Sequence, residues 1–438
     1  MNHGILNRIL RLRPFRKIKE RLRRRLVLQT MHLAEVTPVR FVPVDSGGRR
    51  LNLLLPSINR EDVYGGIATA LHLWDRITAE APADLRFRIV LFDRSPERDA
   101  LERFPGYHAE KDEPSARFQW VDLTNPCDRW LGLGSEDRCI ATSWWTAYIG
   151  IRLMQEQCRF FDLPAISWAY LIQDFEPAFY NWSSRYALAE STYRTSDMQQ
   201  APILRTWALF NTHLLQTYFH RNGYRFWKES VVSPRMHPEL RNRLSGDGFP
   251  PKTPRSRTIV LYGRPGVPRN GFEILLEGLR IWAEQRADRC RTWRVVSAGE
   301  PHPDYPLGNG LVLHSLGKLS IDGYAHLLLE SAIGISLMIS PHPSYPPLEM
   351  AHFGLLTLTN GFAEKDVSTW HDNIHSLSQA TPESLARALE TIVERFETDP
   401  QIGMSGRSHV PEYISDADSF PFRNDLIQSL YAPPHVYS

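Results

Sequence analysis

Short apolar segments alternate with amphipathic helical segments along most of this 438-residue chain. In the first half the predicted strands are 50–56, 87–92, 139–142, 167–172 and 207–211, and helical stretches begin near 65, 144 and 214. In the second half the predicted strands are 258–262, 293–298, 312–313, 334–338 and the run after Glu349, and helices are predicted at about 272–285 and 382–396. Strands and helices alternating at these intervals predict parallel sheets covered on both faces, which is an α/β architecture.

The alternation is interrupted once, at residues 236–256, where Pro, Gly, Arg and Ser accumulate. We interpret this segment as a linker between two domains. The predicted organisation is listed in chain order: a basic amphipathic N-terminal arm (1–35), a Rossmann-like domain (40–235), the linker (236–256), a second Rossmann-like domain (257–414) and a tail (415–438) that forms a helix packing back across the domains. Two doubly wound domains that face each other leave a cleft at the carboxyl ends of both sheets, where ligands of such sheets bind.

The basic arm carries ten of the chain's 51 Lys and Arg residues within residues 1–25, against one of its 49 acidic residues. The remainder therefore has a net charge of −7, which argues against a nucleic-acid-binding body. Apolar residues recur in the arm at helical spacing, and a basic amphipathic helix can lie on an anionic bilayer, each nearby cation adding roughly 1 kcal/mol. A solvated tail is the alternative. We expect a cytoplasmic protein peripheral to the inner face of the cytoplasmic membrane.

The sequence supports neither a membrane-spanning nor a metal-binding protein. No run of 18 apolar residues occurs, so a spanning helix is not expected. The four cysteines show neither CxxC pairing nor metal-ligand spacing, which is typical of reduced thiols in a cytosolic protein. We expect no metal and no cofactor.

Two segments of the second half are candidates for binding a negatively charged ligand. The strand 258–262 runs into GRPGVPRNG (263–271), where Arg264 lies on a Gly-rich turn before a helix. Backbone N–H groups, a helix N-terminus and a guanidinium all favour anionic oxygens, although the arginine of such a turn can equally face solvent. In PLEMAHFGLLTLTNG (347–361), Glu349 stands in the first turn of a short helix before a buried strand, where a carboxylate can accept hydrogen bonds from a sugar diol or simply stabilise the helix.

Candidate catalytic groups lie in the first domain. Asp174 and Glu176 follow the strand 167–172 and face the predicted cleft. Of these two carboxylates, one is expected to act as a base and the other to bind or position. Asp174 is the first choice and Glu176 the second; helix caps or salt bridges are the alternative. Gly65 and Gly66 allow close backbone approach at a helix start, suited to a diphosphate or an acceptor, or they form only a tight turn.

Aromatic side chains crowd the same region: Trp144, Trp145, Trp168, Tyr170, Phe175, Phe179, Tyr180 and Trp182. Most of them are expected in the core, but carbohydrate rings present apolar faces that aromatic rings can cover. The predicted acceptor contacts are Trp144, Trp145, Phe175 and Tyr180. His342, in a proline-rich loop before Glu349, can approach the donor.

The second domain resembles GT-B glycosyltransferases of the GT4-like type. These enzymes carry G-R-x-x-x-x-K-G after the first strand of the C-terminal domain, with the Arg and Lys on the donor diphosphate. Here Arg264 takes the Arg position and Arg269 the Lys position by count, while Lys318 in HSLGKLS (314–320) supplies a second phosphate contact. The E-x-A-x-x-G setting of Glu349 resembles the family's ribose-binding Glu. The other Glu of the E-x7-E pattern is replaced by Pro341, which puts ordinary hexose recognition in doubt.

More of the chain, roughly 40–415, resembles the WsaF-type rhamnosyltransferases of bacterial surface-glycan synthesis. The matching stretches are INREDVYGGIATALHLW (58–74), ATSWWTAY (141–148), YLIQDFEPAFYNWSSRYALAESTY (170–193), GRPGVPRNGFEILLEGL (263–279) and SYPPLEMAHFG (344–354). The resemblance implies a dTDP-rhamnose donor and a rhamnose-containing, lipid-linked glycan acceptor. It predicts an inverting, metal-independent rhamnosyltransferase in which Arg264, Arg269 and Lys318 hold the donor together with Glu349 and the Gly65-Gly66 backbone. A transferase that uses another nucleotide sugar, such as a UDP-hexose, and a non-catalytic glycan-binding GT-B scaffold remain alternatives.

Overall fold

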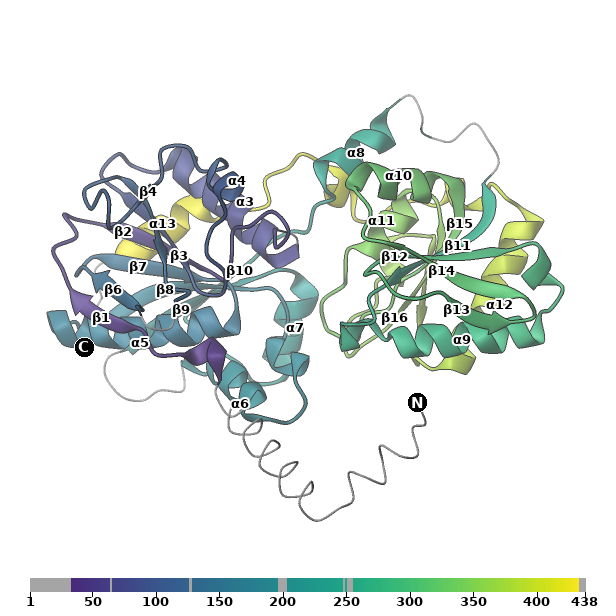
Figure 1. Cartoon of the computed structure of the whole chain (residues 1–438), viewed down its shortest axis with the longest axis horizontal. Helices are drawn as coiled ribbons and strands as arrows, with labels where there is room; N and C mark the ends of the chain where they lie inside the picture. Colours follow the sequence, from purple (N-terminus) through teal and green to yellow (C-terminus); the bar gives the residue numbers. More distant parts are fainter. Residues whose placement is uncertain are drawn as a thin grey trace, which may run out of the picture.

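The computed structural model describes residues 33–63, 65–125, 128–195, 203–246, 249 and 255–432. It contains two α/β domains that lie side by side (Figure 1). The predicted fold class, two facing Rossmann-like domains, is confirmed. Most of the basic arm lies outside the described residues; its last part forms the short helix η1 (Ala34–Val36).

The N-terminal domain is built on an eight-stranded parallel sheet of order β10-β9-β8-β7-β2-β3-β5-β4. Its strands are β2 (Arg50–Leu55), β3 (Arg86–Leu91), β4 (His108–Ala109), β5 (Phe118–Asp122), β7 (Asp137–Ala141), β8 (Ala165–Ile172), β9 (Ile203–Phe210) and β10 (Lys228–Val231). A separate parallel pair joins β1 (Arg40–Pro43) to β6 (Trp130–Leu133). Because helices cover both faces, every residue of β2 is buried, as continuous apolar strands of parallel sheets usually are.

Helices of the N-terminal domain form two layers around this sheet (Figure 1). One core unites the sheet with α3 (Gly65–Glu80), α4 (Arg98–Leu101) and α13 (Arg423–Tyr431). The other unites it with α5 (Trp144–Phe161) and α7 (His213–Arg221). The short elements η2 (Glu176–Phe179) and α6 (Ser184–Ser191) continue from β8 at the edge of the domain.

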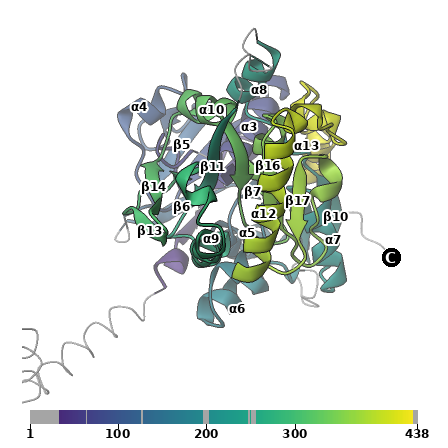
Figure 2. The same ribbon diagram turned by 90° about the vertical axis from the view of Figure 1, so that its right-hand side faces the viewer.

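The C-terminal domain has a seven-stranded sheet of order β13-β14-β12-β11-β15-β16-β17, parallel except for the β13–β14 pair. Its strands are β11 (Ser256–Gly263), β12 (Arg294–Gly299), β13 (Tyr305–Gly308), β14 (Leu311–Gly317), β15 (Ser331–Ile335), β16 (Leu356–Asn360) and β17 (Ile374–Leu377). The helices α9 (Phe272–Gln285) and α12 (Pro382–Thr398) pack on one face, and α10 (Ile321–Glu330) and α11 (Pro346–His352) on the other (Figure 2).

The chain passes between the two domains twice. The segment that the sequence predicts as a linker contains a helix, α8 (Pro238–Ser245), with Pro238 at its first position and the His237 ring accepting from the Glu239 N–H. Beyond the second domain the chain returns, and α13 packs against α3 and β8. Ion pairs fix this return: Arg423 lies 2.6 Å from Glu80, and Lys228 lies 2.5 Å from Asp425.

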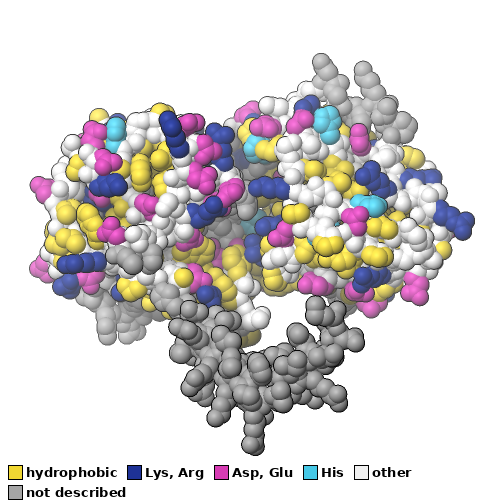
Figure 3. All heavy atoms as spheres, in the orientation of Figure 1, with side chains coloured by type: hydrophobic (Ala, Val, Ile, Leu, Met, Phe, Trp, Pro, Cys, Tyr) yellow, Lys and Arg dark blue, Asp and Glu magenta, His cyan; other side chains and the backbone are white. Residues whose placement is uncertain are grey.

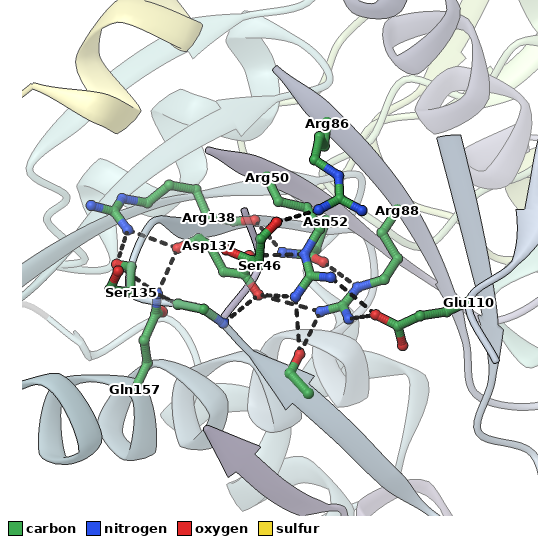
Figure 4. A network of polar contacts seen from close by, with 12 residues as sticks. Ser46, Arg50, Asn52, Arg86, Arg88, Glu110, Ser135, Asp137, Arg138 and Gln157 are labelled. Atoms are coloured by element: carbon green, nitrogen blue, oxygen red, sulfur yellow. Dashed lines mark hydrogen bonds and ion pairs between the residues drawn. The ribbon is translucent and has the colours of Figure 1, made fainter. Parts of the chain in front are cut away.

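A buried polar network ties the middle strands of the N-terminal sheet together (Figure 4). Arg50 and Arg88, both almost fully buried, share the Asp137 carboxylate, with Arg50 Nη2 2.7 Å from Asp137 Oδ2. Arg88 also lies 2.6 Å from Glu110 and donates to Asn52 Oδ1 at 2.7 Å. Burial lowers the pKa of Arg88 to about 10. Since a buried charge is tolerated only when paired, this network stabilises the register of β2, β3 and β7.

Within the ranges that the structure describes, every helix is either too short or too polar to cross a membrane.

Candidate functional site

The two sheets present the carboxyl ends of their strands to the boundary between the domains. The segments that follow β8 and β9 on one side face those that follow β11 and β15 on the other. Figure 3 shows a furrow between the two lobes, with basic side chains on both of its sides. Parallel sheets place their ligands at this edge.

Asp174 is the N-terminal domain's main contribution to this boundary. Its side chain is 8% exposed, and its Oδ1 accepts from the Phe175 N–H at 2.8 Å. The Ser340 hydroxyl of the C-terminal domain donates to the same oxygen. Its other oxygen, Oδ2, lies 3.8 Å from Arg269 Nε. A carboxylate from one domain is therefore held by a hydroxyl and a cation of the other.

Arg269 belongs to the turn after β11, in the short helix η4 (Pro268–Asn270). Its guanidinium lies 4.1 Å from the centre of the Phe179 ring, and its carbonyl accepts from the Ile339 N–H at 2.7 Å. Burial lowers the pKa of Arg269; Asp174 counteracts this effect, and Arg264 reinforces it. Two guanidinium groups thus approach each other closely enough to repel. An anionic oxygen between them would relieve that repulsion. That Arg264 and Arg269 bind a diphosphate stays a prediction.

Glu176 has a different hydrogen-bond partner from Asp174. Its carboxylate accepts from the Trp144 N–H, the first backbone donor of α5. Burial raises the pKa of Glu176 to about 8, with the Trp144 N–H acting in the opposite direction. A carboxyl group that is largely neutral at pH 7 and bonded to a helix N-terminus is suited to positioning rather than to accepting a proton.

Glu349 lies on α11, behind the turn that carries Arg264 and Arg269. It is partly buried, and three tyrosines interact with it electrostatically: Tyr324, Tyr345 and Tyr413. Burial raises the pKa of Glu349 to about 7, and the Tyr324 hydroxyl opposes the shift. Tyr262, near the end of β11, interacts with both Tyr324 and Arg269, so the carboxylate and the arginine turn belong to one edge of the C-terminal sheet.

Four further polar residues complete the boundary: Asn211, Ser340, His342 and Lys365. His342 is 8% exposed, and its Nδ1 accepts from the Ser344 N–H at 3.0 Å. The other ring nitrogen, Nε2, lies 3.1 Å from the side-chain amide nitrogen of Asn211 in the N-terminal domain. Burial lowers the pKa of His342 to about 4, which keeps the ring neutral.

Lys365 is the least expected of these residues. Its side chain is 1% exposed and donates to the Met338 carbonyl. Burial lowers its pKa to about 7, and the Asp174 carboxylate acts in the opposite direction. Lys365 thus interacts electrostatically with the same carboxylate as Arg269.

Sequence reasoning missed Asn211, Ser340 and Lys365. Asn211 follows β9 directly, and Ser340 follows β15 by five residues. The rule that singled out Asp174, polar residues just beyond a buried strand, could have found both. No sequence signal distinguishes Lys365, in the polar turn after β16, from an exposed lysine.

The four predicted acceptor contacts differ in how much of each residue is exposed. Trp144 is fully buried, and Phe175 is 6% exposed within the aromatic core around Tyr193 and Phe219, so neither offers a face to a ligand. The prediction that Trp144 and Phe175 contact the acceptor is therefore wrong. Their rings pack in the core beneath the site and do not line it. Trp145 and Tyr180 are partly exposed, and Tyr180 accepts from the Trp144 indole at 2.9 Å.

The glycine and lysine predictions lie on the two sides of the boundary. Gly65 begins α3 at φ 51°, and the Gln173 amide donates to the Gly66 carbonyl, so the amide occupies the space beside that glycine. Lys318 is exposed directly after β14. Among the described residues no three His, Cys, Asp or Glu side chains are grouped as a metal ion would need.

Comparison with known domain families identifies the two halves. The N-terminal domain of WsaF matches residues 50–207, and the C-terminal domain of WsaF matches residues 257–390. Together these matches cover more than half of the chain, in the order and over the domains that the structure shows. The chain belongs to the WsaF family. Its two α/β domains have the GT-B fold.

A curated relative supports the same assignment. The O-antigen biosynthesis protein RfbC of Myxococcus xanthus is 27% identical over 288 residues, which cover 64% of this chain and 20% of RfbC. This WsaF-family chain therefore spans about a fifth of the length of that relative.

Solved structures agree on the fold. TarM superposes with a TM-score of 0.53 at 9% identity, over 89% of this chain and 100% of TarM. An E. coli protein described as trehalose-6-phosphate bound with UDP-2-fluoro glucose superposes with a TM-score of 0.52 at 10% identity, over 88% of this chain and 99% of its own. At such low identity these similarities concern the fold alone.

Proposed function

We propose that this WsaF-family protein transfers L-rhamnose from dTDP-rhamnose to a rhamnose-containing, lipid-linked acceptor in bacterial surface-glycan synthesis. The observation that carries the proposal is the meeting of Asp174 with Arg269 across the domain boundary, 3.8 Å apart. This pairing supports a reaction in which a carboxylate of one domain acts as the base beside a cation of the other that binds the diphosphate, as glycosyl transfer needs.

In the proposed reaction Asp174 takes the proton of an acceptor hydroxyl as its oxygen forms a bond to the anomeric carbon. The bond from that carbon to the diphosphate oxygen breaks, and its electrons leave with dTDP. Arg264, Arg269 and Lys318 stabilise the charge that develops on the diphosphate. Attack opposite the leaving group inverts the anomeric configuration, and the protein cations make a metal ion unnecessary.

The choice of rhamnose rests on the sequence resemblance and on one feature of the donor side. Position 341, where related enzymes have a sugar-binding carboxylate, is a proline, and its neighbours Ser340 and His342 already bond to Asp174 and Asn211. A 6-deoxy sugar has fewer hydroxyl groups to bind and therefore tolerates the loss of that carboxylate.

The localisation is proposed on the charge of the basic arm. Its ten Lys and Arg residues would hold the enzyme at the inner face of the cytoplasmic membrane, where a lipid-linked acceptor is presented.

A transfer assay with radiolabelled dTDP-rhamnose and a synthetic rhamnosyl acceptor tests the proposal, and NMR of the product's anomeric signal tests inversion. Transfer in the presence of EDTA is expected. Absence of both rhamnose transfer and dTDP binding would refute the proposal. Stabilisation by UDP-sugars rather than by dTDP in a thermal-shift panel would favour the UDP-hexose alternative. A scaffold would keep its cellular role when Asp174, Glu176 and Glu349 are each replaced by Ala.

A further inference from the structure

A hydroxyl group of the C-terminal domain reaches the proposed base of the N-terminal domain. Ser340 is 3% exposed, and its hydroxyl donates to Asp174 Oδ1. The same hydroxyl oxygen accepts from the His342 N–H at 3.0 Å. A hydroxyl has a single hydrogen, and a carboxylate oxygen only accepts, so that hydrogen is directed at Asp174. The direction of this hydrogen bond across the domain boundary is therefore fixed.

The two carboxylate oxygens of Asp174 have different surroundings. Oδ1 accepts from the Phe175 N–H at 2.8 Å and from the Ser340 hydroxyl, which together use its two lone pairs. Oδ2 lies 3.8 Å from Arg269 Nε, which is beyond ordinary hydrogen-bond length. Oδ2 is thus the oxygen that remains to take a proton, and the two donors on Oδ1 determine where it points.

The segment that carries this hydroxyl, residues 338–342, is braced within its own domain. The Ile339 N–H donates to the Arg269 carbonyl at 2.7 Å. One position earlier, the Met338 carbonyl accepts from the buried Lys365 side chain. Because both contacts lie next to the hydroxyl in the chain, the hydroxyl moves with the C-terminal domain and not independently of it.

Other contacts at this point hold the two domains together. The Asn211 side-chain nitrogen of the N-terminal domain lies 3.1 Å from His342 Nε2 and donates to the Tyr345 hydroxyl at 3.2 Å. Ser340 adds a contact to the base itself. Its effect on Asp174 is therefore separable from the docking of the domains.

We propose that Ser340 is a positioning residue that orients Asp174 from the opposite domain, so that the base is set only when the two domains are docked. The hydroxyl holds Oδ1, and Oδ2 is thereby directed to the acceptor hydroxyl. Closure of an active site commonly completes its catalytic arrangement, and one hydroxyl would do so here. The orientation of Asp174 stands on these contacts, whereas its effect on turnover rests on the proposed function.

A direct contact with the donor sugar is the competing use of Ser340. Polar groups that fix a ligand's orientation must be open to that ligand. The Ser340 hydroxyl is buried, gives its hydrogen to Asp174 and accepts from the His342 N–H. These contacts favour a positioning role over a sugar contact.

A double-mutant cycle measures whether Ser340 acts through Asp174. Ser340→Ala should lower kcat for rhamnose transfer roughly tenfold, with the dTDP Kd unchanged, because the base is present but less well aimed. In the Asp174→Asn background the same change should have no further effect. The matched control is Ser336→Ala, directly after β15, which removes a buried hydroxyl that has no hydrogen-bond partner among the described residues. It should leave kcat unchanged.

Hydrogen exchange followed by mass spectrometry tests the orientation without turnover. In the full-length protein without ligand, Ser340→Ala should speed exchange of the peptide 173–180 several-fold, since the carboxylate that accepts from the Phe175 N–H is no longer held from the other side. Ser336→Ala should leave the exchange of this peptide as in the wild type.

Equal kcat for Ser340→Ala and wild type would overturn the proposal, as would an equal loss of kcat with and without the Asp174 carboxylate. Unchanged exchange of the peptide 173–180 would also overturn it. A dTDP Kd weakened as much as kcat would assign Ser340 a purely structural role and so contradict the proposal. Failure of the proposed function is a separate result: wild-type protein that transfers no rhamnose, while the peptide 173–180 still responds to Ser340→Ala.

Discussion

Arg269 of the C-terminal domain and Asp174 of the N-terminal domain face each other across the furrow, with Nε 3.8 Å from Oδ2. Each is also held by a second group, Arg269 by the Phe179 ring and Asp174 by the Ser340 hydroxyl. The two side chains that the proposed reaction needs for the donor and for the acceptor are thus paired with each other. A diphosphate that engages Arg269 would release Asp174 toward the acceptor hydroxyl.

Replacing the proposed base should abolish most of the turnover. Asp174→Asn keeps the size of the side chain but removes its ability to take a proton, and general-base catalysis typically contributes about a hundredfold to ten-thousandfold. We expect kcat to fall by at least about a hundredfold, with little change in dTDP affinity, measured by transfer assay and calorimetry. Glu176→Gln is the matched control, since Glu176 caps α5, and it should retain far more activity. The reverse ranking would exchange the two roles.

Removing the cation opposite Asp174 should weaken nucleotide binding. Arg269→Ala deletes a charge-assisted contact, which is worth about tenfold to a hundredfold in dTDP affinity. Arg280→Ala is the control: this arginine lies on α9 in an exposed pair with Glu277 and should not affect the dTDP Kd. Titration calorimetry at constant ionic strength measures the dTDP Kd of both variants. Equal Kd values for the two variants would remove Arg269 from the donor site.

The pKa of Glu176 predicts a pH-dependent stability difference. In the folded protein this carboxyl has a pKa of about 8, whereas its ordinary value is 4.5. Its contribution to stability is complete below pH 4.5 and declines as pH rises toward 8, because the unfolded chain releases the proton first. Glu176→Gln should therefore gain stability relative to wild type by roughly 1 kcal/mol per pH unit between pH 5 and 8. Chemical denaturation of both proteins across this pH interval measures the gain, and an equal dependence of stability on pH in both would contradict it.

Breaking the buried network of the N-terminal sheet should cost far more than breaking a surface pair. Asp137→Ala leaves Arg50 and Arg88 buried without their shared carboxylate, and loss of one partner of a buried pair costs about 3–5 kcal/mol. Asp84→Ala removes an exposed partner of Arg49 and should cost far less, because a surface ion pair is screened by solvent. The free energies of unfolding of both variants, from urea titration, would contradict this account if they proved equal.

Features that depend on neighbouring residues could be predicted from the sequence, whereas features that depend on residues far apart in the chain could not. Periodicity is local, so the helix predicted at 272–285 occurs as Phe272–Gln285, and the apolar runs became buried strands. The helix α8 was missed because Pro, Gly and Arg composition suggested a linker, although Pro238 suits the first turn of a helix.

The candidate site shows the same difference between local features and long-range contacts. Asp174 was predictable because it follows a buried strand, but its pairing with Arg269 joins residues nearly a hundred positions apart. The burial of Lys365 could not be predicted from its neighbours in the chain, since the Met338 carbonyl to which it donates lies 27 positions away. Trp144 and Phe175 were misassigned because aromatic composition does not reveal which rings fill the core.

The last prediction concerns the pH dependence of donor binding. Glu349 has a pKa of about 7, raised by burial, so its carboxyl is largely neutral at pH 6 and largely ionised at pH 8. If the ionised carboxylate accepts a hydrogen bond from the deoxyribose hydroxyl of dTDP, affinity should rise across that interval, because an ionised acceptor bonds more strongly than a neutral one. We expect the wild-type Kd for dTDP to improve several-fold from pH 6 to pH 8. Glu349→Gln should remove most of the dependence that remains after the diphosphate's own titration is subtracted, with dTDP-rhamnose, whose diphosphate is a diester, as the cleaner ligand. A pH profile for Glu349→Gln that superposes on the wild-type profile would exclude this carboxylate from the nucleotide site.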